Sequence, residues 1–209
     1  MTVNHLNIPG CILSGGEARR LGGKGKAFIE VSGKPMIKII IEKLQNQVLQ
    51  IGINTRDKKT ILDGDFVHIE DSFKEVGGAG PLAGISSAIK WAKELQKYNH
   101  NIQYVLTVPV DCPFLPNNLV NILIEPLNEH AYDVVVASSN NNIHPVIALW
   151  SLKLDKFLES ALLSGVRKID KFTKNFNIKV VNWDYQNLDP FFNINNFEDL
   201  MLANNHIKC

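Results

Sequence analysis

The chain has 209 residues, 45% hydrophobic and 21% charged, a balance typical of a soluble globular protein, and we expect residues 1–209 to form one domain. A net charge of +1 gives no excess of positive charge for a nucleic-acid or membrane-surface partner, and no run approaches the ~20 apolar residues of a membrane span. The N-terminus lacks the parts of a signal peptide, and the three cysteines form no metal-binding spacing, so we expect a cytoplasmic protein with reduced thiols.

A glycine-rich, cationic loop follows the first apolar run, Cys11 to Leu13. It holds four glycines around two arginines and ends on Lys24-Gly25-Lys26. Glycines let backbone N–H groups approach phosphate oxygens, and Arg and Lys supply the opposite charge. The spacing fits neither a P-loop nor the G-x-G-x-x-G of dinucleotide-binding folds, which fails at Phe28. The loop therefore suggests a phosphate site of another kind, with a basic surface loop as the alternative.

After this loop, short β-rich runs alternate with longer helical patterns. The alternation predicts an α/β, Rossmann-like domain whose central sheet is mostly parallel and has helices on both faces. Turns are expected at residues 32–35 and 140–142. The predicted strands are 11–13, 48–54, 66–69, 104–109, 132–137, 146–150 and 178–181. Helices are predicted at 36–47, 81–95, 116–127, 152–163 and 166–176, the last with a solvated basic face, and from 196 onward.

Polar residues follow three of the predicted strands. Asn54 ends one strand, Asp71 follows the next, and Asp111 comes directly after 104–109. The carboxyl ends of parallel strands meet at one edge, which is where open α/β sheets bind ligands. A carboxylate such as Asp111 is the kind of ligand that Mg²⁺ prefers, although an Asp that opens a turn before Pro113 is the alternative.

A second glycine-rich stretch, residues 77–84, opens a long amphipathic helix. Gly80 followed by Pro81 favours a tight turn, and Leu82 begins the apolar face. The first N–H groups of such a helix can face an anion, and a plain helix start is the alternative.

Farther along the chain, two further features could belong to a site. His144 has no metal-ligand spacing around it, and a single His is more often structural than catalytic. Asn193 and Asn195 fall on one side of an extended segment, because side chains alternate with a period of two.

Taken together, these segments resemble one family, the nucleotidyltransferases known as molybdenum cofactor guanylyltransferases. They follow the order of the family along nearly the whole chain. Two positions depart from the pattern of the family. Many relatives carry Asp where this chain has Gly25, and Ala is usual where this chain has Ser14. The similar segments are 13–26, 69–71, 80–84, 110–113, 144–145 and 192–195.

The resemblance implies a fold like that of nucleotide-diphospho-sugar transferases and a defined reaction. GTP and molybdopterin would give the guanine dinucleotide cofactor and pyrophosphate, with Mg²⁺ held by Asp111. Lys26, Asp111 and Arg20 would be catalytic, and His144, Asn193 and Asn195 are candidates on the side of the acceptor substrate. The nucleotide would lie against Leu13, Ser14, Gly15, Gly16, Lys26, Asn54, Asp71, Gly80, Pro81, Leu82 and Asp111.

By the same resemblance, molybdenum-insertion proteins and molybdoenzyme chaperones are conceivable partners. The expected chemistry is in-line attack by a phosphate of molybdopterin on the α-phosphorus of GTP, which needs charge neutralisation rather than a protein nucleophile. Three alternatives remain open at this stage. They are transfer to a sugar 1-phosphate, CTP-dependent cytidylyl transfer to molybdopterin, and a GTP-binding module or cofactor carrier without turnover.

Overall fold

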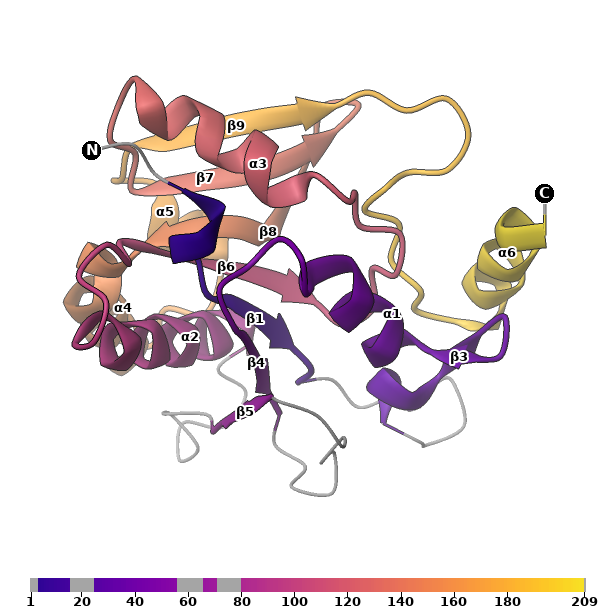
Figure 1. Cartoon of the computed structure of the whole chain (residues 1–209). Helices are drawn as coiled ribbons and strands as arrows, with labels where there is room; N and C mark the ends of the chain where they lie inside the picture. The colour runs from indigo at the N-terminus through magenta and orange to yellow at the C-terminus, as the bar shows by residue number, and fades with distance from the viewer. Residues whose placement is uncertain (1–3, 16–24, 56–65, 71–79, 209) are drawn as a thin grey trace.

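The chain folds around one twisted sheet (Figure 1). A computed structural model describes residues 4–15, 25–55, 66–70 and 80–208. Within these residues, seven strands pair in the order β5-β4-β1-β6-β8-β7-β9. The strands are β1 (Gly10–Leu13), β4 (Ile51–Asn54), β5 (Val67–Ile69), β6 (Tyr104–Pro109), β7 (Val134–Ser139), β8 (Asn142–Ser151) and β9 (Ile178–Trp183).

The sheet is mostly parallel, which confirms the prediction. The pairs β1–β4, β1–β6, β4–β5 and β7–β9 are parallel, and β8 runs antiparallel to both β6 and β7. The reversal comes from a tight hairpin in which Asn140 and Asn141 have φ of 44° and 69°. Positive φ at both central residues is the geometry of the two-residue turn that matches strand twist, and Asn tolerates it. The turn lies where the sequence places it, but β8 begins at Asn142 rather than at residue 146.

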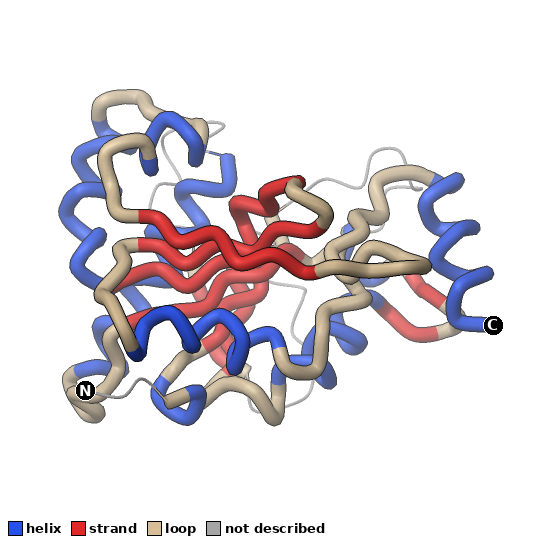
Figure 2. Tube along the Cα trace, turned by 90° about the horizontal axis from the view of Figure 1, so that it is seen from above, coloured by secondary structure: helices blue, strands red, loops and turns tan. Residues whose placement is uncertain are grey.

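Helices cover both faces of the sheet (Figure 2). One face carries α1 (Met36–Leu44) and α3 (Leu119–Ile124), whose apolar sides pack on inward side chains such as Ile12 and Val108. The other face carries α2 (Gly80–Gln96), α4 (Asp155–Leu163) and α5 (Ile169–Thr173). Between these layers β4, β6 and β7 are buried almost throughout, as expected of strands covered on both faces, whereas the edge strand β9 is largely exposed.

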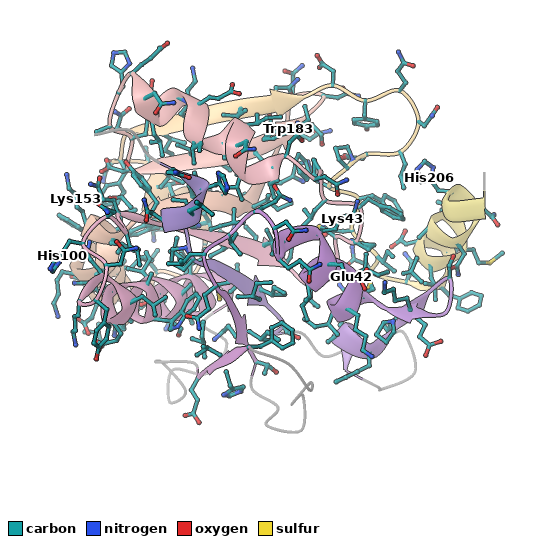
Figure 3. All side chains as sticks on the ribbon, in the orientation of Figure 1. Glu42, Lys43, His100, Lys153, Trp183 and His206 are labelled. Atoms are coloured by element: carbon teal, nitrogen blue, oxygen red, sulfur yellow. The ribbon has the colours of Figure 1, made fainter. Side chains whose placement is uncertain are left out.

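A third, smaller core lies to one side of the sheet. The hairpin of β2 (Glu30–Val31) and β3 (Lys34–Pro35) packs against α6 (Phe197–Lys208). The backbone N–H of Ser32 donates to Asn204 Oδ1 at 2.7 Å. His206, labelled on α6 in Figure 3, stacks edge-on against Phe114 with ring centroids 5.6 Å apart. Core residues of this unit are Ile29, Val31, Met36, Ile194 and Ala203.

Short 3₁₀ turns account for part of the difference between predicted and observed helices. They are η1 (His5–Asn7), η3 (Lys26–Phe28), η4 (Glu125–Asn128) and η5 (Leu152–Leu154). Among the described residues, no helix combines the length and the hydrophobicity needed to cross a membrane.

The helix predicted over 166–176 is wrong in its extent. In the structure only α5 (Ile169–Thr173) is helical in this region, and Arg167 precedes it. The guanidinium of Arg167 donates to the carbonyls of Leu162 and Val166 at 2.9 and 3.0 Å. Arg167 is therefore half-buried at the end of α4 rather than on a solvated helix face, because cations satisfy the open carbonyls at a helix C-terminus.

Candidate active site

Three parallel strands bring their carboxyl ends to one edge of the sheet. Leu13, the last residue of β1, is in register with Asn54 of β4 on one side and with Pro109 of β6 on the other. Just beyond the strands, the Ser14 N–H donates to the Asn54 carbonyl at 2.8 Å and the Val110 N–H donates to the Leu13 carbonyl at 3.1 Å. The backbone at Leu13 and Ser14 and the turn leading to Asp111 are therefore neighbours.

At this edge, Lys26 and Asp111 form an ion pair between Nζ and Oδ2. The same Nζ donates to Asn195 Oδ1 at 2.7 Å. Three residues far apart in the sequence thus meet around one ammonium group. The side chains of Lys26 and Asp111 are only 15% and 17% exposed, so their charges act in a partly desolvated setting, where they are less screened than on the open surface.

The segment 191–195 is fastened to the turn that carries Asp111. The Ile194 N–H donates to the Asp111 carbonyl at 3.0 Å. Beside it, the Cys112 thiol donates to Asn193 Oδ1 at 2.7 Å. Burial, and secondly the Asp111 charge, raise the pKa of Cys112 well above its usual range, so the thiol keeps the proton it donates. The segment is not a strand, and Asn193 and Asn195 are held by two different partners.

The start of α2 lies against the same edge. An added Cβ at Gly84 would come within 2.9 Å of Asn54 Oδ1 and 3.1 Å of a Leu13 methyl, so the helix approaches the strand ends closely. Asn54 is buried, and its Nδ2 donates to the Ile69 carbonyl at 3.1 Å. In the first turn, Gly80 (φ 62°) and Pro81 are exposed and Leu82 belongs to the core.

His144 lies in a second cluster rather than beside Lys26. Its Nε2 is 2.5 Å from Ser139 Oγ, and that hydroxyl donates to Asp189 Oδ2 at 2.8 Å. The ring packs against Phe191 at an interplanar angle of 57°, with centroids 5.0 Å apart. Because the Cys112 thiol also approaches the Phe191 carbonyl, at 3.5 Å, the two clusters are joined through the segment 189–195.

The remaining predicted positions include some that the structure does not describe. Gly16, Arg20 and Asp71 lie outside the described residues. Gly15 is described and exposed, and nothing lies within 4 Å of an added Cβ there. In the part of the chain that the structure describes, no three His, Cys, Asp or Glu side chains are grouped as a metal site. Among the described residues, Asp111 is therefore not part of such a group.

Several contacts at the site have no local signal in the sequence. Ser139 and Asp189 are 50 residues apart, and no motif connects them. Gly84 and Cys112 stand inside recognisable motifs, but their contacts with Asn54 and Asn193 depend on how distant segments pack.

A doubly covered, mostly parallel sheet with a Lys–Asp pair at its carboxyl edge defines a class, the α/β nucleotidyltransferases. The MobA-like NTP transferase domain matches residues 10–177, and the chain belongs to this family. Molybdenum cofactor guanylyltransferases of two Rhodopseudomonas palustris strains are 34% identical (BisB5; 96% of this chain, 94% of the relative) and 37% identical (HaA2; 93% and 90%).

Solved structures agree on the fold. Molybdopterin-guanine dinucleotide biosynthesis protein A of Archaeoglobus fulgidus superposes with a TM-score of 0.74 at 24% identity, over 96% of this chain and 99% of that one. The 4-diphosphocytidyl-2C-methyl-D-erythritol synthase of Anaerococcus prevotii gives 0.71 at 17% identity, over 97% and 96%. The fold is therefore shared by proteins whose names point to different products.

Proposed function

We propose that this nucleotidyltransferase transfers GMP from GTP to molybdopterin and releases pyrophosphate. The contact of Lys26 with Asp111 and Asn195, at the carboxyl edge of β1 and β6, carries the proposal. The relatives named guanylyltransferases, which align along nearly the full chain, support the choice of substrates.

The reaction joins two anions. A terminal phosphate oxygen of molybdopterin attacks the α-phosphorus of GTP, a new P–O bond forms, and the bond to the β-phosphate oxygen breaks as pyrophosphate leaves. No covalent enzyme intermediate is required, so the protein contributes position and positive charge. Lys26 is suited to this task because its ammonium is already held at the strand edge by Asp111 and Asn195.

The nucleotide is expected to lie along the edge of the sheet. The backbone from Leu13 to Gly15 forms the end of β1 and the residues after it, and α2, which begins at Gly80, approaches Asn54 closely at Gly84. Asn54 is buried and its amide donates to the Ile69 carbonyl, which fixes its side chain at the edge where the nucleotide is proposed to bind. By the family resemblance alone, Gly16 and Asp71 complete the proposed nucleotide site and Arg20 is a catalytic residue.

Asp111 fits the binding of Mg²⁺ with a triphosphate. Mg²⁺ is commonly held by only one or two carboxylates together with substrate phosphates, so a single carboxylate at the edge is a suitable donor. Lys26 engages Oδ2 of Asp111, and Oδ1 has only a distant thiol, Cys112 Sγ at 4.0 Å, among its described partners. When bound, the ion would neutralise phosphate charge, and Asp111 would hold it.

Substitution of Lys26 or Asp111 tests the proposal. Removing one electrostatic contact with the transition state lowers the rate about 10²–10³-fold, so Lys26→Ala and Asp111→Ala should each lose at least that much guanylyl transfer while remaining folded. Lys34→Ala is the matched control, because it removes a lysine that pairs with Glu42 on the exposed surface, and its activity should stay near wild type. Near wild-type transfer by Lys26→Ala or Asp111→Ala would remove that residue from the mechanism.

A different acceptor substrate or nucleotide is the second candidate, because the fold is shared with a protein named for cytidylyl chemistry. Incubation with each NTP and Mg²⁺, with molybdopterin or sugar 1-phosphates as acceptor substrates, distinguishes guanylyl transfer to molybdopterin from these other reactions. GTP with molybdopterin should release pyrophosphate fastest. Faster release with CTP, or with a sugar 1-phosphate, would replace the proposed reaction by that one.

A further inference from the structure

A hydrogen-bonded chain of three side chains stands beside the proposed active site. Asp189 Oδ2 accepts from the Ser139 hydroxyl at 2.8 Å, and Ser139 Oγ lies 2.5 Å from His144 Nε2. Asp189 is held in turn, because its Oδ1 accepts the Phe191 N–H at 2.8 Å. Ser139 and His144 come from the two strands of the β7–β8 hairpin, whereas Asp189 comes from the segment that leads to Asn195.

Counting protons along this chain fixes the tautomer of His144. A serine hydroxyl has one hydrogen, and an ionised carboxylate can only accept. The hydrogen of Ser139 therefore goes to Asp189, and the short contact with His144 requires a hydrogen on Nε2. In a neutral imidazole the other nitrogen, Nδ1, is then left with its lone pair as a hydrogen-bond acceptor.

The neutral state of His144 is favoured by its surroundings. Burial lowers the pKa of His144, and the charge of Asp189 opposes this without reversing it. Within the described residues no hydrogen bond to Nδ1 is formed, and the imidazole is only half-buried. A ligand that reaches this ring thus meets a hydrogen-bond acceptor rather than a cation.

The position of the ring suggests which ligand this is. His144 packs at a tilt against Phe191, and Phe191 meets Trp183, labelled near the end of β9 in Figure 3, edge-on with ring centroids 5.2 Å apart. The same segment continues to Asn193 and Asn195, which contact Cys112 and Lys26. Phe191 is itself buried and fixes the imidazole in place, so what the half-buried ring offers a ligand is the acceptor Nδ1, which suits a heterocycle that carries N–H donors.

We propose that Asp189 and Ser139 are positioning residues that hold His144 with its hydrogen on Nε2, so that Nδ1 accepts a hydrogen bond from an N–H group of the pterin ring of the acceptor substrate. This inference rests on the proposed function for the identity of that substrate. The tautomer itself follows from the three side chains alone, so the two parts can be tested separately.

One substitution should reverse the chain of hydrogen bonds. In Asp189→Asn, the Phe191 N–H still requires an oxygen, so the amide oxygen faces Phe191 and the Nδ2 group faces Ser139. Nδ2 then donates to Ser139 Oγ, whose hydrogen is released to His144 Nε2. The imidazole must move its hydrogen to Nδ1, which becomes a donor and opposes an N–H group of the substrate.

The test measures both the protonation of the two ring nitrogens of His144 and the KM values for the two substrates. The ¹⁵N shifts of His144 should show a protonated Nε2 in wild type and a protonated Nδ1 in Asp189→Asn, and the KM for molybdopterin should rise roughly tenfold with the KM for GTP unchanged. Asp184→Asn makes the same change at an exposed carboxylate that accepts from Asn182, and it should alter neither quantity.

A second pair of variants guards against misfolding of Asp189→Asn. In Ser139→Ala both neutral tautomers of His144 should be populated, and the KM for molybdopterin should rise roughly 3- to 10-fold. Ser139→Thr, which keeps the hydroxyl, should restore the wild-type tautomer and the wild-type KM. Ser138→Ala is the control, because that neighbouring hydroxyl bonds to Val181 and Asn182 instead.

Each outcome of these experiments bears on one part of the inference. A wild-type His144 protonated on Nδ1 overturns the assignment of the tautomer. Normal guanylyl transfer with an unchanged KM for molybdopterin in a variant whose tautomer has switched overturns the substrate contact alone. A wild-type protein that transfers no GMP to molybdopterin overturns the proposed function and this contact, and leaves the tautomer to be judged by its own ¹⁵N shifts.

Discussion

The absence of a side chain at Gly84 lets α2 pack closely on the carboxyl edge of the sheet, where the nucleotide is proposed to bind. A Cβ at Gly84 would meet Asn54 Oδ1 at 2.9 Å, and Asn54 cannot move freely because its amide also donates to the Ile69 carbonyl. Replacing a helical glycine by Ala normally gains about 1 kcal/mol of stability, but overpacking a tight contact costs roughly 1–3 kcal/mol. We therefore predict that Gly84→Ala does not gain this stability and that it raises the KM for GTP by displacing Asn54.

The matched control for Gly84→Ala is Gly25→Ala. Gly25 has ordinary negative φ, and an added Cβ there meets only Phe28 Cδ2, at 3.9 Å. The same conformation would accommodate Asp, the residue that the family resemblance leads us to expect at this position, so glycine is not required here by the backbone. Urea unfolding and initial-rate kinetics of the two variants provide the comparison. A Gly84→Ala protein as active as wild type, and more stable, would contradict the close-contact argument.

His144 also makes stability depend on pH. Burial lowers its pKa below the ordinary value of 6.5, so between that value and the folded-state pKa the unfolded chain binds the proton and the folded chain does not. The contribution is complete above about pH 6.5 and is lost as the pH falls through the folded-state pKa. We predict that wild type loses more stability between pH 7.5 and pH 5 than His144→Gln, as measured by urea midpoints. Parallel pH profiles of the two proteins would show that His144 titrates as it does in the unfolded chain.

At the scale of the elements, the sequence predicts those whose pattern is local. The strand 104–109 is predicted with its observed bounds, because a continuous apolar run between polar ends has one simple interpretation. The turn at 140–142 is predicted from its asparagines, which tolerate positive φ. Helix 166–176 is too long in the prediction because its basic residues suggest a solvated face, whereas Arg167 is recruited by the carbonyls that end α4.

The residues of the candidate site likewise fall into two groups, those with a local signal in the sequence and those brought together by long-range packing. Lys26 and Asp111 stand out locally, one in a glycine-rich loop and the other after a buried strand, and the family resemblance assigns both to one active site. Contacts made by the segment 189–195 could not be predicted, because its path depends on packing against a turn about 80 residues earlier in the chain. Period-two alternation places Asn193 and Asn195 on one side, but it does not reveal that one binds Cys112 and the other Lys26.

The molecule as a whole places the site where two cores meet. Asp111 follows a strand of the main sheet and Lys26 precedes Ala27 of the main core, whereas Asn195 follows Ile194, which belongs to the small core formed with α6. The Lys26 contacts with Asp111 and Asn195 therefore connect the two cores. A ligand that engages Lys26 and Asp111 together would stabilise this junction, so nucleotide binding should register in the stability of the whole protein.

This coupling gives a global measure of nucleotide preference. A ligand that binds only the folded state adds about 2.7 kcal/mol of stability at 100 times its Kd, and a protein of this size gains roughly 2–4 °C in Tm for each kcal/mol. With Mg²⁺ present, we predict that GTP raises the Tm by roughly 5–10 °C, more than equal concentrations of CTP or ATP. Asp111→Ala should lose most of the shift, whereas Lys34→Ala should retain it. A larger shift with CTP would instead favour cytidylyl transfer, because the folded protein would then be selecting the other base.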